Sequence, residues 1–375
     1  MSLNFRFAVI SDLHIALPHT MWNHPSRFHL VEVSIPVLEN ILDRLSRLEL
    51  DFLLLPGDLT QHGEPANHTW LAERLAQLPY PTYVVPGNHD VPTLESDGKA
   101  IGLANFPHYY RSYGYDNPGQ LYYTCQLLPG VRLIGLNSNQ FDAQGKQLGC
   151  LDDAQLSWLQ TVLAEHQDDL MLVMVHHNVV EHLPGQSRNP LGRRYMLDNA
   201  PTLLKMLRAA NVQLVFTGHL HVQDIACSEG VYDITTGSLV SYPHPYRVLE
   251  LQTDDRGQRS LHIASGRVES VPGWETLQQT SRDFMGERSQ PFMLQLLMQS
   301  PLKLSQAEAA ELVPHLRSFW ADLANGDARF AFPAFPTSAR RYFERFSAID
   351  ANGQPQCIDN NATLLLSQRG VDCSL

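Results

Sequence analysis

Five short polar segments in the first 221 residues carry side chains suited to metal chemistry. They are Asp12-Leu13-His14, Gly57-Asp58, Gly87-Asn88-His89-Asp90, His176-His177 and Gly218-His219-Leu220-His221. The candidate metal ligands they supply are Asp12, His14, Asp58, Asn88, His176, His219 and His221. This mixture of carboxylate, imidazole and amide oxygen suits Mn, Fe, Zn or Co, and it differs from a thiolate site.

The elements that must position these side chains are predicted from hydrophobic patterns. Each polar segment follows or lies close to a short apolar run that is typical of a buried strand. The runs cover residues 7–10, 52–55, 83–85, 171–175 and 212–216. Ligands bind at the carboxyl ends of the strands in open α/β sheets, so we expect these distant segments to form one site.

Helical patterns separate the predicted strands. Ser34 and Asp152 are each placed to cap a helix, and Pro201 is placed in the first turn of a third helix. The alternation of strand and helix from residue 5 to about residue 222 predicts an α/β fold.

A glycine precedes a candidate ligand in three of the polar segments. The three are Gly57, Gly87 and Gly218. A chain that leaves a strand here must turn sharply, so we expect a conformational role for these glycines, such as a positive φ.

The order D-x-H, G-D, G-N-H-D, H-H, G-H-x-H resembles the calcineurin-like metallophosphoesterase superfamily over roughly residues 5–265. Residues 57–65 further resemble the bacterial class III cyclic nucleotide phosphodiesterases, which often have G-D-L-x-x-x-G-E-P there. The resemblance implies a four-layer sandwich of two mixed β-sheets flanked by helices. It also implies two metal sites bridged by Asp58. One would contain Asp12, His14 and His221, and the other would contain Asn88, His176 and His219.

The implied chemistry is hydrolysis at phosphorus. Two metals about 3.5 to 4 Å apart can contact both the attacking and the leaving oxygen, and they lower the pKa of a bound water to about 7, which yields a hydroxide nucleophile. His89 is interpreted as the general acid for the leaving oxygen, with Asp90 orienting its imidazole. The alternative is that Asp90 caps a turn and His89 is a structural residue that packs against its neighbours.

Substrate contacts are predicted from neighbouring residues. His177 and His62 are interpreted as substrate-binding residues, and the alternative for His177 is support of the ligand beside it. The polar loop 236–244 is predicted to lie near the metals, either as a substrate contact or as a plain turn.

The predicted function is therefore a dinuclear metal-dependent phosphodiesterase acting on a small diester, such as a 3′,5′-cyclic nucleotide or a glycerophosphodiester. The alternatives are a phosphomonoesterase or Ser/Thr protein phosphatase of the same fold, and a non-catalytic scaffold. The complete ligand set disfavours the scaffold. No arginine stands beside Asp58, Asn88 or His219, which favours the diester, although the arginines between residues 188 and 194 could reach the site.

The length of 375 residues suggests two domains. A catalytic domain is predicted at 1–268, ending in edge strands near 246–251 and 261–264, and a mainly helical domain at 269–375. Ser305 and Glu308 have capping-box spacing in the second domain. We interpret this domain as a structural cap or homo-oligomerisation surface, with a lid over the substrate pocket as the alternative. Residues from about 360 are expected to be weakly ordered.

Composition limits the partners and the location. A net charge of −12 argues against binding of nucleic acid. Five cysteines without a C-x-x-C pair favour a reducing compartment. The N-terminus has no secretory pattern, and no apolar run approaches the ~18 residues that a membrane span needs. We expect a cytoplasmic enzyme that acts on a small phosphate ester and has no membrane partner.

Overall fold

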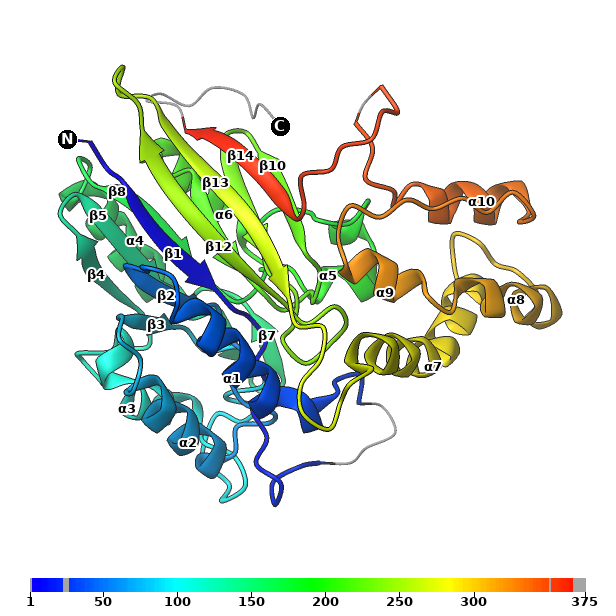
Figure 1. Cartoon of the computed structure of the whole chain (residues 1–375), viewed down its shortest axis with the longest axis horizontal. Coiled ribbons are helices and arrows are strands. Elements are labelled where there is room, and N and C mark those ends of the chain that lie inside the picture. Colours follow the sequence, from blue (N-terminus) through cyan, green and yellow to red (C-terminus); the bar gives the residue numbers. More distant parts are fainter. Residues whose placement is uncertain (1, 23–26, 351, 367–375) are drawn as a thin grey trace.

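Two six-stranded mixed sheets form the centre of the protein (Figure 1). The structure is a computed structural model that describes residues 2–22, 27–350 and 352–366. The first sheet has the order β14-β13-β12-β1-β2-β3 and the second has the order β10-β11-β9-β8-β5-β4. A separate pair consists of β6 (Asn139–Phe141) and β7 (Gln147–Gly149).

Within each sheet, the strands that lead into the candidate ligands run parallel to one another. In the first sheet β1, β2 and β3 are parallel, and in the second β5, β8, β9 and β11 are parallel. Their carboxyl ends therefore share one rim. The bounds in the first sheet are β1 Phe5–Val9, β2 Phe52–Leu55, β3 Thr82–Val84, β12 Pro245–Thr253, β13 Arg259–Arg267 and β14 Asn361–Leu366. Those in the second are β4 Tyr123–Leu128, β5 Val131–Gly135, β8 Leu170–Met174, β9 Leu214–Thr217, β10 Asp224–Ser228 and β11 Val231–Thr235.

Helices cover the outer faces of the two sheets. The first sheet is flanked by α1 (Ser34–Leu45), α2 (Pro65–Leu75) and the short α3 (Phe106–Tyr109). The second is flanked by α4 (Asp153–Glu165) and α6 (Ala200–Ala209), and α5 (Pro190–Arg193) lies in a connection. Short 3-10 turns occur at Val31–Val33, Leu103–Asn105, Arg111–Tyr113, Gln186–Arg188 and Val313–Leu316. The predicted four-layer sandwich is confirmed.

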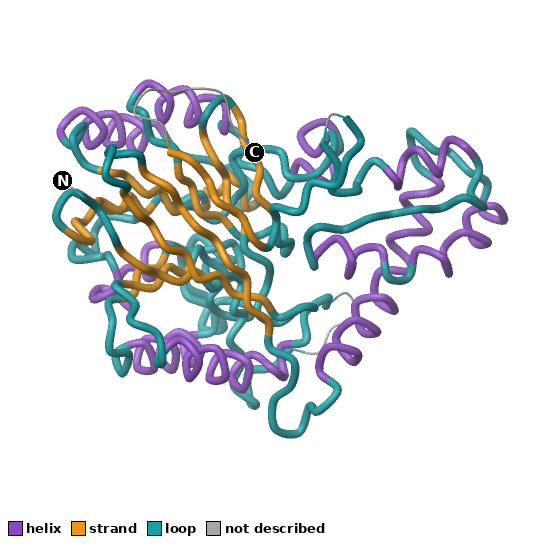
Figure 2. The backbone as a smooth tube through the Cα atoms, turned by 45° about the horizontal axis from the view of Figure 1, so that its top comes forward, coloured by secondary structure: helices purple, strands orange, loops and turns teal. Residues whose placement is uncertain are grey.

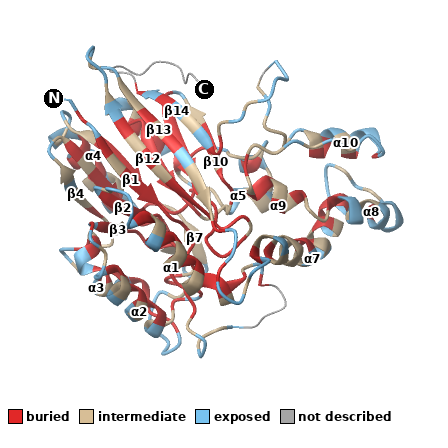
Figure 3. Cartoon of the chain, viewed as in Figure 1, coloured by how far each residue is buried: buried red, intermediate tan, exposed pale blue. Residues whose placement is uncertain are grey.

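The inner faces of the sheets meet in a buried aromatic core. Phe7 on β1 stacks on Phe52 at 4.8 Å between ring centroids, and it meets Phe216 of the other sheet edge-on at 5.5 Å. β1 is buried over most of its length (Figure 3), and every residue of β9 is buried. Burial of these rings is a large favourable contribution to folding, and it fixes the two sheets against each other.

Most of the predicted helix starts are confirmed. The Asp152 carboxylate accepts a hydrogen bond from the Gln155 amide at 2.7 Å, and Pro201 lies in the first turn of α6. Ser305 forms the capping box of α8. Ser34 is the exception: it is the first residue of α1, and its hydroxyl accepts instead from the Ala16 amide at 3.2 Å.

The C-terminal part forms a helical cluster beside the sheets (Figures 1 and 2). It comprises α7 (Leu277–Met298), α8 (Gln306–Leu312), α9 (Phe319–Ala324) and α10 (Thr337–Glu344). Its own apolar core contains Met293, Leu297, Phe319 and Phe343 and also Val222 of the main body. The cluster is therefore packed onto the sandwich.

The chain then returns to the first sheet, which corrects two predictions. β14 pairs antiparallel with β13, with Leu364 opposite Leu261, so residues 361–366 are an ordered strand. β12 and β13 are consequently interior strands and not edge strands. The buried Leu364 and Leu366 supply the apolar face that holds β14 in place. Residues 367–375 lie outside the described part.

The helices and the cysteines bear on the predicted location. No helix within the described ranges combines the length and the apolar character that crossing a membrane requires. Cys125, Cys150 and Cys357 are free thiols, whereas Cys227 is disulfide-bonded. Because disulfides persist mainly in oxidising compartments, this bond gives no support to the cytoplasmic location, which stays a prediction.

Candidate metal centre

The loops after the strands hold the candidate ligands in an unusual backbone conformation. Asp12, His14, Asp58, His219 and His221 have φ values of 51°, 43°, 49°, 67° and 60°. Such left-handed residues cost roughly 1–3 kcal/mol each and cluster at functional sites. Here the loops hold each other, because the Asp12 amide donates to the Gly57 carbonyl at 3.2 Å and the His14 amide donates to the Asp58 carbonyl at 2.9 Å.

The glycines beside the ligands serve two different purposes. Gly57 has a φ of 94°, as predicted. Gly87 and Gly218 do not have a positive φ; they are needed for close approach. A β-carbon at Gly87 would overlap Asp58, and one at Gly218 would overlap Ser11 and Asp12.

The first group of side chains contains Asp12, His14, Asp58 and His221, whose ligand atoms all lie within 4.8 Å of one another. Asp12 Oδ1 is 3.0 Å from His221 Nε2. Both ring nitrogens of His14 are buried without a hydrogen-bond partner. Buried polar atoms are nearly always satisfied in proteins. A cation between these side chains would satisfy them, so the group fits a metal.

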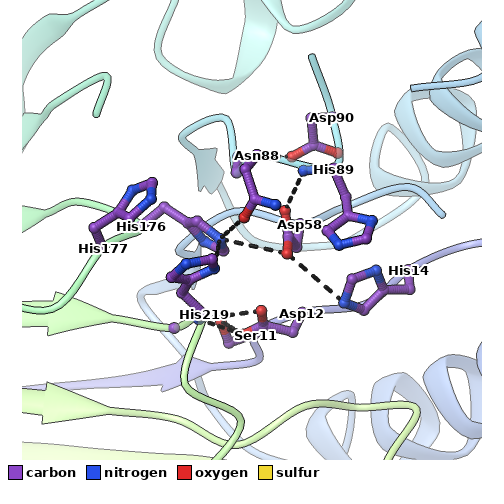
Figure 4. A network of polar contacts seen from close by, with 12 residues as sticks. Ser11, Asp12, His14, Asp58, Asn88, His89, Asp90, His176, His177 and His219 are labelled. Atoms are coloured by element: carbon purple, nitrogen blue, oxygen red, sulfur yellow. Dashed lines mark hydrogen bonds and ion pairs between the residues drawn. The ribbon is translucent and has the colours of Figure 1, made fainter. Parts of the chain in front are cut away.

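The second group contains Asn88, His176 and His219 beside Asp58 (Figure 4). His176 Nδ1 donates to the Pro56 carbonyl at 2.8 Å, and His219 Nε2 donates to the Arg194 carbonyl at 3.2 Å. The remaining nitrogens, His176 Nε2 and His219 Nδ1, then face each other at 3.1 Å and would present lone pairs to a bound metal. Asn88 Oδ1 lies 3.1 Å from the same His176 Nε2. Converging acceptors with tautomers fixed from behind are the arrangement that a metal requires.

Asp58 lies between the two groups. Its Oδ2 is 3.7 Å from His14 Nε2 and 3.4 Å from His176 Nε2, while its Oδ1 accepts from the His89 amide at 2.8 Å. Burial alone would raise the pKa of Asp58, but His176 and His89 hold it well below its usual range. Burial also disfavours the charged form of His176 and so lowers its pKa, but Asp58 outweighs this effect and raises that pKa to about 9. The site thus attracts positive charge.

His89 and Asp90 are adjacent in sequence but act on different partners, which corrects the predicted pairing. The Asp90 carboxylate accepts from the amides of Leu59, Thr60 and Gly87 at 2.8–3.1 Å and from the Thr60 hydroxyl at 3.1 Å. His89 Nδ1 donates instead to the Gln61 carbonyl at 2.9 Å. Asp90 therefore ties the Asp58 loop to the Asn88 loop, and the Gln61 carbonyl orients His89.

The two predicted substrate contacts, His177 and His62, lie in different surroundings. His177 is buried, its Nδ1 is 2.8 Å from Ser138 Oγ, and its ring lies 4.4 Å from that of His219. Burial lowers its pKa to about 3, so it is a neutral support behind His219 that also borders the cavity. His62 is exposed and stacks on Trp22 at 5.5 Å, with its ring 6.0 Å from that of His89.

The polar loop 236–244 also borders the site. The Ser238 hydroxyl donates to the Asp12 carbonyl at 3.0 Å, and Ser241 borders the cavity. His244 is buried and donates from Nδ1 to the Leu239 carbonyl at 2.8 Å. The loop therefore supports Asp12 from behind and reaches the cavity at one residue.

His29 is a residue of the site that the sequence did not reveal. Its ring lies 4.1 Å from that of His14 and 4.8 Å from that of His221, and its buried Nδ1 has no hydrogen-bond partner. The nitrogens of these three histidines lie within 4.8 Å of one another. His29 follows no strand and belongs to no polar segment, so only the tertiary structure brings it here.

A cavity of about 540 Å³ opens onto both groups. Of the arginines considered from the sequence, Arg194 borders it, whereas Arg193 points to Asp198 at 3.5 Å. On the side facing the metal centre the lining includes Asp58, Asn88, His89, His219 and His221.

A sandwich of two mixed sheets with an Asp/His cluster that can hold two metals at its rim defines the class of dinuclear metallohydrolases. Residues 5–223 match the model of the family described as calcineurin-like phosphoesterase, and the chain belongs to this family.

Individual relatives agree with this assignment. A probable cyclic nucleotide phosphodiesterase of Synechococcus is 28% identical over 273 residues, covering 70% of this chain and 93% of the relative. A probable glycerophosphodiester phosphodiesterase of Arcobacter nitrofigilis is 25% identical over 213 residues, covering 56% of this chain and 68% of the relative. A dimetal phosphatase from Danio rerio shares the fold, with a TM-score of 0.51 at 16% identity, over 70% of this chain and 96% of that one.

Proposed function

We propose that the chain is a phosphodiesterase with two metals, held by Asp58 together with the other six candidate ligands. The observation that carries this proposal is the position of Asp58 Oδ2 between the two sets of nitrogen and oxygen atoms. When bound, the metals would supply Lewis acidity at phosphorus and a low pKa for the attacking water. The ligand set suits Mn, Fe, Zn or Co, and elemental analysis of purified protein identifies which.

His29 is proposed as an additional ligand beside His14 and His221. Its unpartnered Nδ1 and its distance from these rings support this role. His29→Ala should then lower the stoichiometry of bound metal without loss of the fold, which elemental analysis and circular dichroism measure together. Unchanged metal content would leave His29 as a packing residue.

His89 is proposed as the general acid. Because Nδ1 donates to the Gln61 carbonyl, Nε2 is the atom that can carry the proton to be transferred. In the overall reaction water provides an oxygen to phosphorus, one P–O bond breaks, and the leaving alcohol takes up a proton. The products are a phosphate monoester and an alcohol, so the step is balanced without a further reactant.

Charge at the cavity bears on the choice between a diester and a monoester. The cavity contains two arginines, Arg194 and Arg345, and their guanidinium groups lie over the rings of Tyr195 and Tyr342 at 4.7 and 4.4 Å. These cations would also suit the second negative charge of a monoester, so the proposed preference for a diester is supported by the relatives named as phosphodiesterases.

The direct test compares metal-reconstituted protein on bis-p-nitrophenyl phosphate, p-nitrophenyl phosphate and cyclic AMP. We expect the first to be hydrolysed with a kcat/KM well above that of the second. A preference for p-nitrophenyl phosphate would favour the phosphomonoesterase alternative, and inactivity on all three with both metals bound would favour the scaffold.

A further inference from the structure

The C-terminal helices form the wall of the cavity that faces the metal centre. The residues of α7 that line it are three or four positions apart and so lie along one stripe of the helix. They are Met285, Ser289, Phe292 and Leu296. Phe319 and Trp320 of α9 and Phe346 after α10 extend the same wall. The part of the chain after the catalytic sheets thereby completes the substrate cavity.

This wall borders the same cavity as the metal centre. One cavity is bordered by both Asp58 and Phe292, and its volume of about 540 Å³ lies within the range of roughly 300–1,000 Å³ typical of small-molecule sites. A phosphate held at the metal centre would direct one of its ester groups toward the helices.

The part of the wall formed by α7 and α9 has few free groups that could form hydrogen bonds with a base or a sugar. The Ser289 hydroxyl donates to the Gly286 carbonyl at 3.0 Å, and Trp320 Nε1 donates to Met293 Sδ at 2.9 Å. On the other side, Gln186 Oε1 accepts from the amides of His182 and Leu183. These polar groups are already used within the protein.

What the wall does offer is apolar surface. Met285, Phe292 and Trp320 are only partly buried and face the cavity. Leu183 and Leu220, from loops of the catalytic part, line the same cavity and contribute similar surface. A hydrocarbon group that displaced water from these side chains would gain free energy in proportion to the area covered.

The charge of the lining differs from that of the whole protein. The chain carries a net charge of −12. Among the described residues that line the cavity, Asp58 is the single carboxylate, and Arg194 and Arg345 are cations. The cavity therefore combines positive charge for a phosphate with an apolar wall.

We infer that this cavity is a subsite for an alkyl or aryl ester group, and that the substrate is a phosphodiester of one bulky apolar alcohol. The inference rests on the proposed phosphodiesterase function and narrows its substrate class. Glycerol or nucleoside groups, suggested by the names of the relatives, would place hydroxyl and base edges against the apolar surface of Met285, Phe292 and Trp320, which is unfavourable.

The test uses the metal-loaded full chain and a series of p-nitrophenyl esters: methyl, butyl, hexyl and phenyl p-nitrophenyl phosphate. Burial of one methylene is worth up to about fourfold in affinity. With partial burial, we expect kcat/KM to rise at least about thirtyfold from the methyl to the hexyl ester, mainly through KM, since the same contact exists before and during the reaction.

A pair of matched variants localises the effect on α7. Met285→Gln should reduce the ratio of hexyl to methyl kcat/KM by about three- to tenfold, because it places an amide in the apolar wall. Met298→Gln makes the same exchange on the same helix at a residue that is 41% exposed and does not line the cavity. It should leave the ratio unchanged.

The outcomes separate this inference from the proposed function. Hydrolysis of all esters at similar rates would overturn the subsite and leave the phosphodiesterase intact. If no diester is hydrolysed, the proposed function fails, and calorimetry with hexylphosphonate and methylphosphonate then decides the subsite. Tighter binding of hexylphosphonate, lost in Met285→Gln, would support it, and equal binding would overturn it.

Discussion

Asp90→Asn tests whether this carboxylate fastens the metal-binding loops. In the least damaging orientation, the new amide NH₂ faces Thr60, whose hydroxyl can turn to accept from it. The Thr60 amide then loses its acceptor, and the bonds from Leu59 and Gly87 lose the charge of the carboxylate. An unsatisfied buried donor costs about 1–3 kcal/mol, and a neutral acceptor is weaker by about 1 kcal/mol. With one bond lost and two weakened, we expect a loss of roughly 3–5 kcal/mol in the free energy of unfolding.

Burial raises the pKa of Asp90 to about 7, so the carboxylate carries its full charge only above that pH. Guanidinium chloride denaturation of the metal-free protein at about pH 9 therefore measures this loss without the contribution of bound metal. Asp97→Asn is the matched control, because Asp97 also accepts from backbone amides but lies in an exposed turn. It should change the free energy of unfolding by less than about 1 kcal/mol. An Asp90→Asn variant with unchanged stability but sharply reduced activity would refute the fastening role and restore the pairing of Asp90 with His89.

Four further outcomes are expected. Asp58→Ala should lose most of both metals, and elemental analysis showing two metals still bound would exclude the bridging role. His89→Ala should keep its metals and slow alkyl diesters by about 10² to 10⁴, with a smaller loss for nitrophenolate leaving groups; equal losses would remove the acid assignment. A chelator should lower the melting temperature, because metals that bind only the folded chain stabilise it; scanning calorimetry measures this. Burial lowers the pKa of His182, but Asp233 and Asp224 outweigh this effect and raise that pKa to about 10. The protonated His182 therefore stabilises the folded protein fully below pH 6.5, and this stabilisation is lost as the pH rises toward 10. His182→Gln should flatten that decline in denaturation curves between pH 6 and 10.

Local patterns in the sequence were sufficient for the parts of the fold that depend on near neighbours. The apolar runs before Asp12 and Asp58 predicted strands because a short run of consecutive apolar residues is itself the signal of a buried strand. Asp152 predicted a helix start because a cap needs only three further residues. The order of the polar segments identified the family, since each segment belongs to one strand end.

Contacts between distant segments were decided only by the tertiary structure. His29 has no local signal and reaches His14 and His221 through the path of its loop. The partners of Asp90 could not be inferred from its neighbour His89, because the carboxylate accepts from three donors after Asp58 and from the Gly87 amide of its own segment.

The C-terminal part shows the same limit on a larger scale. β14 is short and follows helices, so its place in the sheet depends on a free edge of β13 about a hundred residues away. The stripe of Met285 and Phe292 is compatible with a core face or with a cavity wall. Sequence spacing fixes which side chains share a helix face, but what that face meets depends on where the rest of the chain packs.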